Sequence, residues 1–126
     1  MHRSELLAEL GPPEGTTGQP EGDAVSWCYA DLELGLSVRH LVWYIAIEPS
    51  CFRITLPARM HLGPIETPAK DTLLRDLASR GEAVEACAPY VPDELWWRVP
   101  ASGVLMSFSE DGWLDNVHTS DRSLLP

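Results

Sequence analysis

The sequence predicts the α+β fold class: a single domain, residues 1–126, in which helices pack on one face of an antiparallel sheet. Three observations lead to this prediction. Each half of the chain holds one apolar helical stretch, each stretch precedes a run of short alternating strands, and glycine-containing turns separate several of those strands. Consecutive strands joined by short hairpins are antiparallel. A length of 126 residues suits one domain with a single core.

The spacing of the tryptophans indicates that the two halves are related. The interval from Trp27 to Trp97 equals the interval from Trp43 to Trp113, and apolar positions around them recur at the same interval. We therefore expect two degenerate helix–strand-meander pseudo-repeats. Their bounds are residues 4–56 and 67–118.

In the first pseudo-repeat, Ser4 is expected to cap a short helix whose leucines form one apolar stripe, and Gly11 ends that helix. Residues 11–23 are mostly Gly, Pro, Thr and Glu, which predicts a loop. The strands that follow are recognised by alternation of apolar and other residues. They are expected at residues 25–29, 32–38, 41–47 and 52–56, with residues 59–62 as a further candidate.

In the second pseudo-repeat, Thr67 and Pro68 are expected to start a helix that buries a leucine stripe and ends at Gly81. An irregular link is predicted over residues 87–93. Two glycine-containing turns then separate three strands. These strands are expected at residues 95–99, 104–108 and 113–117, followed by a loose tail.

The chain is strongly acidic. It carries 9 basic and 19 acidic residues, which give a formal net charge of −10 and a pI near 4.6. Such a surface repels phosphate backbones and anionic lipid, and it attracts a basic protein surface. We therefore expect neither a nucleic-acid nor a membrane partner. The alternative is that the acidity serves only to keep the protein in solution.

The cysteines and the N-terminal residues give no sign of export. Three cysteines at irregular spacing do not suggest a disulfide framework and suit a reducing compartment. The N-terminal residues lack the apolar core of a signal peptide. The longest apolar run, residues 41–47, is far shorter than the roughly 20 residues that cross a bilayer. The expected location is the cytoplasm.

The sequence contains no strong catalytic motif, and we expect no enzyme activity, cofactor or metal site. It has no glycine-rich phosphate loop, Cys-x-x-Cys pair or paired-histidine zinc helix. Two weaker sets remain as alternatives. His118 with a nearby acid and hydroxyl would be a small hydrolase site, and a cysteine–histidine set would bind zinc, although it lacks close ligand pairs. The zinc set is Cys28, His40, Cys51 and His61.

Neighbouring tryptophans on one predicted strand must point to opposite faces of the sheet. Trp97 is expected in the core, which leaves Trp96 on the other face, together with Tyr44 from the strand that is apolar on both faces. Large aromatic residues ringed by polar groups carry much of the energy of protein interfaces. We therefore predict a partner-binding site of aromatic residues and acidic turn residues. It comprises Trp96, Tyr44, Asp93, Glu94, Glu110 and Asp111.

One pattern in the sequence combines a helix end with two strands. The run Leu10-Gly11-Pro12-Pro13 gives a leucine-glycine-x-proline helix end, and after a loop Trp27-Cys28-Tyr29-Ala30-Asp31-Leu32-Glu33-Leu34 gives an aromatic strand and a Y-x-D-L-E-L strand. This pattern resembles that of small bacterial toxin-immunity proteins. The second half keeps residues 102–108 and 113–117 of such a pattern but has Ala78-Ser79 in place of glycine-proline. Two units of this kind are also similar in plan to the β-lactamase inhibitor proteins, whose cysteine pairs this chain lacks.

The resemblance implies a stoichiometric protein inhibitor and carries no catalytic residues over. Our hypothesis is a non-catalytic, cytoplasmic immunity protein that neutralises a bacterial toxin by occluding its active surface. The acidic charge favours a basic toxin domain as the partner. The alternative is a small-molecule-binding or regulatory α+β module that uses the concave sheet face. A homodimer that covers the exposed aromatic residues is a further alternative.

Overall fold

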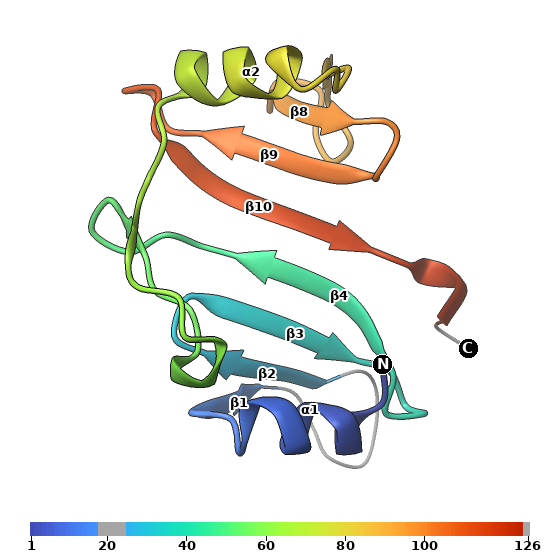
Figure 1. Cartoon of the computed structure of the whole chain (residues 1–126). Helices are drawn as coiled ribbons and strands as arrows, with labels where there is room; N and C mark the ends of the chain where they lie inside the picture. Colours follow the sequence, from blue (N-terminus) through green and yellow to red (C-terminus); the bar gives the residue numbers. More distant parts are fainter. Residues whose placement is uncertain (18–24, 125–126) are drawn as a thin grey trace.

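The computed structural model describes residues 1–17 and 25–124 of the chain. Its main element is an eight-stranded antiparallel sheet. The first half of the chain supplies β1 (Gly15–Thr17), β2 (Val25–Tyr29), β3 (Leu32–Leu36) and β4 (Val42–Ile47). The second half supplies β7 (Glu85–Cys87), β8 (Trp96–Val99), β9 (Val104–Phe108) and β10 (Leu114–Ser120). The strand order is β1-β2-β3-β4-β10-β9-β8-β7, so that β4 and β10 form the central pair (Figure 1).

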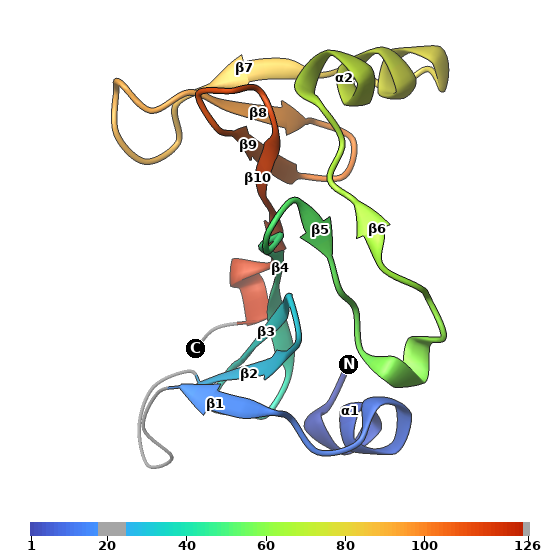
Figure 2. The same cartoon turned by 90° about the vertical axis from the view of Figure 1, so that its left-hand side faces the viewer.

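Two α-helices and a short arm lie on one face of this sheet. The helices α1 (Arg3–Leu10) and α2 (Lys70–Ser79) lie near its opposite ends. Between them, β5 (Arg53–Ile54), the 3-10 helix η1 (Ala58–Met60) and β6 (Ile65–Glu66) form the arm, whose strands pair only with each other. Figure 2 shows the helices and the arm on one side of the sheet, the helix face, and the 3-10 helix η2 (Arg122–Leu124) on the other, the open face.

The core of the protein lies on the helix face and consists of two apolar clusters. Alternation along β3 places Leu32, Leu34 and Leu36 on this face, where Leu6 of α1 packs against them. The same alternation turns Glu33 to the open face. On the strands of the second half, a matching group of buried residues, which includes one residue of the arm, packs with leucines of α2 at its edge. This group is Ile54, Val99, Met106 and Leu114.

The predicted fold class is wrong: the protein is mainly β, not an α+β fold of helix–meander repeats with helices layered on the sheet. The two α-helices have 8 and 10 residues. No residue of α2 is buried, and α1 buries only Leu6, while Leu7 of the expected stripe is 44% exposed. Apolar spacing indicates that helices form, but it does not reveal how little of a broad sheet such short helices cover.

Both helices start at other residues than predicted. His2 rather than Ser4 caps α1, because its side chain accepts a hydrogen bond from the Ser4 backbone N–H at 3.1 Å. The helix α2 begins at Lys70 rather than at Thr67. The segment before it is held against β10, where the Leu114 N–H donates to the carbonyl of Pro68 at 3.1 Å.

Several predicted loops and strands also differ from the structure. The predicted loop of residues 11–23 contains the edge strand β1, and its last six residues, 18–23, lie outside the described part of the chain. The first two residues of the candidate strand at 59–62 belong to the 3-10 helix η1, and the predicted link at 87–93 begins inside β7. Edge strands such as Gly-Thr-Thr have no apolar alternation, so the sequence does not reveal them.

Candidate functional site

A row of cross-strand neighbours crosses the open face. In the register of the sheet, Cys28 lies opposite Glu33, Glu33 opposite Ala46, and Ala46 opposite His118. Cross-strand partners point to the same face, and so do alternate residues of one strand, which adds Tyr44 from β4. The row therefore joins an acidic group at one end to the histidine of a central strand.

Three aromatic side chains surround the imidazole of His118. The ring centroids of Tyr44, Tyr90 and Trp96 lie 5.6, 5.9 and 5.1 Å from that of His118. We call these four residues the aromatic cluster. The structure thus brings together Tyr44 and Trp96, the two aromatic residues predicted for the site. Sequence reasoning missed the role of Tyr90, which is 28 positions from His118 and reaches it only through the fold.

Trp96 faces the open side of the sheet, but it is 7% exposed rather than a surface residue. The ring of Tyr90 packs edge-on against it with a centroid distance of 5.4 Å, and its Nε1 donates to the Glu94 carboxylate. Trp96 is therefore a support beneath the loop of residues 88–95, not the exposed anchor that we expected. The large exposed residues next to it are Tyr90, Val91 and Leu95.

His118 is buried among these rings, and its burial lowers the pKa of its imidazole below the ordinary value. The ring is therefore neutral at neutral pH. Its Nε2 lies 2.9 Å from the Tyr90 hydroxyl, and its Nδ1 is buried without a hydrogen-bond partner among the described residues. A proton on Nε2 would donate to Tyr90 and leave only a lone pair unpaired at Nδ1, which is the less costly arrangement.

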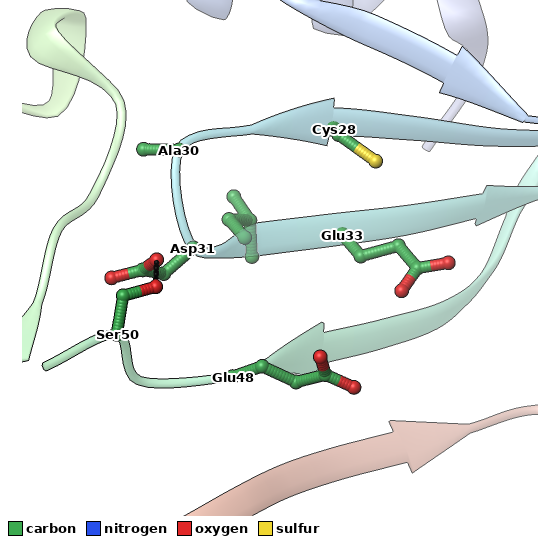
Figure 3. A pocket seen from close by; sticks show the side chains of 7 residues that line it. Cys28, Ala30, Asp31, Glu33, Glu48 and Ser50 are labelled. Atoms are coloured by element: carbon green, nitrogen blue, oxygen red, sulfur yellow. Dashed lines mark hydrogen bonds between the residues drawn. The ribbon is translucent and has the colours of Figure 1, made fainter.

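Glu33 and Glu48 form the acidic end of the open face. They line a pocket of about 200 Å³ near the turn between β2 and β3. Figure 3 shows Glu33 on β3 and Glu48 just beyond the end of β4, with their side chains extending in the same direction, whereas the carboxylate of Asp31 is turned toward Ser50. The Ser50 hydroxyl donates to Asp31 at 2.7 Å. Asp31 is thus committed to holding the turn, and Glu33 and Glu48 are the carboxylates that a ligand would meet.

Neither Glu33 nor Glu48 takes part in an ion pair within residues 1–17 and 25–124. Glu48 accepts one hydrogen bond, from the Asn116 side chain at 3.0 Å. Burial first and then the charge of Glu33 raise the pKa of both Tyr44 and Cys28. Both groups are therefore protonated at neutral pH, so the Cys28 thiol is not activated as a nucleophile. The ion pairs found in the described residues are Asp76–Arg80 and Glu85–Arg98.

The predicted acidic rim is divided between two places. Asp93 and Glu94 are exposed in the loop of residues 88–95, beside the aromatic cluster. Glu110 and Asp111 are exposed in the turn between β9 and β10.

That second turn belongs with the arm rather than with the aromatic cluster. Trp113, at its end, packs edge-on against Phe52, in the turn that leads into the arm, with a ring-centroid distance of 6.0 Å. Both acidic segments are close to strand ends in the sequence. The sequence therefore does not show that only the loop of residues 88–95 lies beside the aromatic cluster.

The structure does not bring together the residues of the alternative zinc site or of the alternative hydrolase site. Cys28 lies on β2, whereas Cys51 is exposed in the turn before β5. Across the described ranges, no three His, Cys, Asp or Glu side chains come together as ligands of a metal ion. The hydrogen-bond partner of His118 is Tyr90 and not Asp121, whose carboxylate accepts from the Ser123 hydroxyl at 2.5 Å.

Comparisons with protein-family models, with curated proteins and with solved structures find no match to this chain. The helices of the described residues are too short and too polar for a membrane span. A functional assignment therefore depends on the chemistry of the open face.

Proposed function

We propose that this protein binds and blocks a basic protein partner through the open face of its sheet, as an immunity protein that neutralises a bacterial toxin in the cytoplasm. The observation that carries the proposal is the position of Tyr44. Its ring packs on His118 in the aromatic cluster, and the charges of Glu33 and Glu48 act on its hydroxyl. An aromatic surface thus adjoins two carboxylates that have no basic partner within the described residues.

This arrangement suits a lysine or arginine of the partner. A cation that reaches the open face meets two carboxylates beside an aromatic cluster, and both attract it. The net charge of −10 adds a long-range attraction that accelerates association with a basic surface.

The loop of residues 88–95 supplies the apolar part of the proposed interface. Tyr90 is 54% exposed, and Val91 and Leu95 are exposed as well. Asp93 and Glu94 lie among them. Apolar residues with a charged rim are the usual composition of a protein interface.

The acidic charge of this protein explains how it blocks such a toxin. A toxin that acts on a nucleic acid presents a basic surface to the phosphates, and an acidic protein that covers this surface excludes the substrate. The resemblance to immunity-type proteins supports this kind of inhibitor, and the raised pKa of Cys28 does not favour nucleophilic attack by its thiol.

The test uses the protein encoded by the gene next to this one. We expect a one-to-one complex in which the activity of that protein falls in proportion to the amount of this chain added. The double variant Glu33→Gln/Glu48→Gln should weaken binding at least tenfold, or about 1.4 kcal/mol. The control Asp71→Asn/Glu82→Gln removes the same charge at exposed positions outside the open face and should bind like the wild type. Equal loss in both double variants, or no complex, contradicts the proposal.

A further inference from the structure

A large apolar groove lies on the helix face, between α1 and η1. Its volume is about 690 Å³, within the range of about 300–1,000 Å³ that is typical of small-molecule sites. The buried residues Leu6, Leu32 and Leu34 lie along it, so that its inner surface is apolar and belongs to the core of the first half.

The rim of this groove is also apolar and is open to solvent. Met1 is 62% exposed, Ile45 41% and Met60 40%. These residues come from the N-terminus, from β4 and from η1, and they line the same groove. Neighbouring exposed apolar residues of this kind are unusual on a protein surface and mark sites that bind something apolar.

The charged side chains that line the groove are two glutamates of α1. Glu5 accepts a hydrogen bond from the His2 backbone N–H at 2.6 Å and so helps to cap the helix. Glu9, one turn further on, is exposed. Arg59, next to Met60 in η1, has its guanidinium against Gly11 at the end of α1 and does not line the groove. The groove therefore offers an apolar surface with negative charge along one side.

We infer that this groove binds a small amphiphile with an apolar body and a cationic ammonium head. The body lies against Leu34 and Ile45, and the head lies at the Glu9 carboxylate. This site is on the face opposite the aromatic cluster, so it does not depend on the proposed partner or on its binding.

Calorimetric titration of the full chain with octyltrimethylammonium, kept below the concentration at which it forms micelles, tests the inference. We expect one molecule to bind per chain, at least tenfold more tightly than octyl sulfate, which has the opposite charge on the same tail. Tetramethylammonium, which has the head alone, should show no measurable binding. Glu9→Gln should reduce the preference for the cation without abolishing binding of the tail.

Two rim variants locate the site. Ile45→Lys and Met60→Lys place a cation at exposed positions on two sides of the groove, and each should weaken binding at least tenfold. Val38→Lys, at an exposed apolar position that does not line the groove, should bind like the wild type. Absence of binding, equal affinity for both head groups, or unchanged affinity in both rim variants overturns the inference. A stable dimer that Ile45→Lys converts to a monomer also overturns it, because a second copy of the chain would then cover the groove.

Discussion

The Tyr90 hydroxyl lies 2.9 Å from Nε2 of His118, and this contact ties the loop of residues 88–95 to a central strand of the sheet. Trp96 packs beneath it, with its ring centroid 5.4 Å from that of Tyr90 and 5.1 Å from that of His118. The loop that carries the exposed apolar residues is thus held in place. A preorganised loop loses less conformational entropy when it binds a partner.

The substitution Trp96→Ala should lower the free energy of unfolding by about 3 kcal/mol or more, because it removes a large buried ring from a packed cluster. Urea denaturation measures the change. Trp113→Ala is the matched control. Because Trp113 is 40% exposed, its substitution should lower the free energy of unfolding clearly less. A loss at Trp96 no larger than the loss at Trp113 would mean that the aromatic cluster does not stabilise the fold.

Acid should destabilise the fold through His118. Its folded-state pKa is lowered by burial, whereas in the unfolded chain the imidazole takes up a proton below about pH 6.5. The stabilisation that comes from a neutral His118 is fully present above about pH 6.5. It is lost as the pH falls below this value toward the lower pKa of the folded state.

The measurement is the free energy of unfolding between about pH 8 and pH 5, where histidines titrate. It should fall more steeply with acid in the wild type than in His118→Gln, which has no titrating side chain at position 118. The exposed His61 supplies the control variant, His61→Gln, which should keep the wild-type slope. Identical slopes in all three proteins would show that His118 is not held neutral by the fold.

Much of the sheet could be predicted from the sequence, but the candidate site could not be predicted as a whole. The strands β3 and β9 follow from alternation of apolar residues, which the burial of one sheet face requires. The shared pocket of Glu33 and Glu48 depends on the register between β3 and β4, and the contact of Tyr90 with His118 depends on an irregular loop. Neither relationship has a local signal in the sequence.

The substitution Gly35→Ala should destabilise the fold by about 1–3 kcal/mol through overpacking. A Cβ atom at this position would lie 2.9 Å from the Tyr44 Cβ and 3.2 Å from the Trp43 Nε1. Because Tyr44 must shift, partner binding should weaken as well. Gly63→Ala is the control, since nothing lies within 4 Å of its Cβ position. If thermal denaturation shows the same stability for Gly35→Ala and for the control, the close packing of Gly35 against Tyr44 and Trp43 is contradicted.

The turn before β5 is strained, and relieving the strain should stabilise the protein. Cys51 and Phe52 have φ angles of 51° and 62°, and Ser50 and Arg53 exchange two backbone hydrogen bonds around them. Such two-residue hairpin turns favour asparagine and glycine. Cys51→Asn should therefore raise the free energy of unfolding by about 0.5–1 kcal/mol. Cys51→Ala keeps the strain and should leave the stability unchanged; an equal gain in both variants would rule out the backbone as the cause.

Hydroxyl-radical footprinting of the complex with the basic partner tests most directly whether the open face is the binding surface, because it reports the solvent exposure of individual side chains. Tyr44 and Tyr90 sample the open face, while Phe52 and Trp113 sample the exposed aromatic residues near the arm. We predict that binding protects Tyr44 and Tyr90 from oxidation and leaves Phe52 and Trp113 as reactive as in the free protein. Protection of Phe52 and Trp113 with unchanged reactivity of Tyr44 and Tyr90 would contradict the assignment.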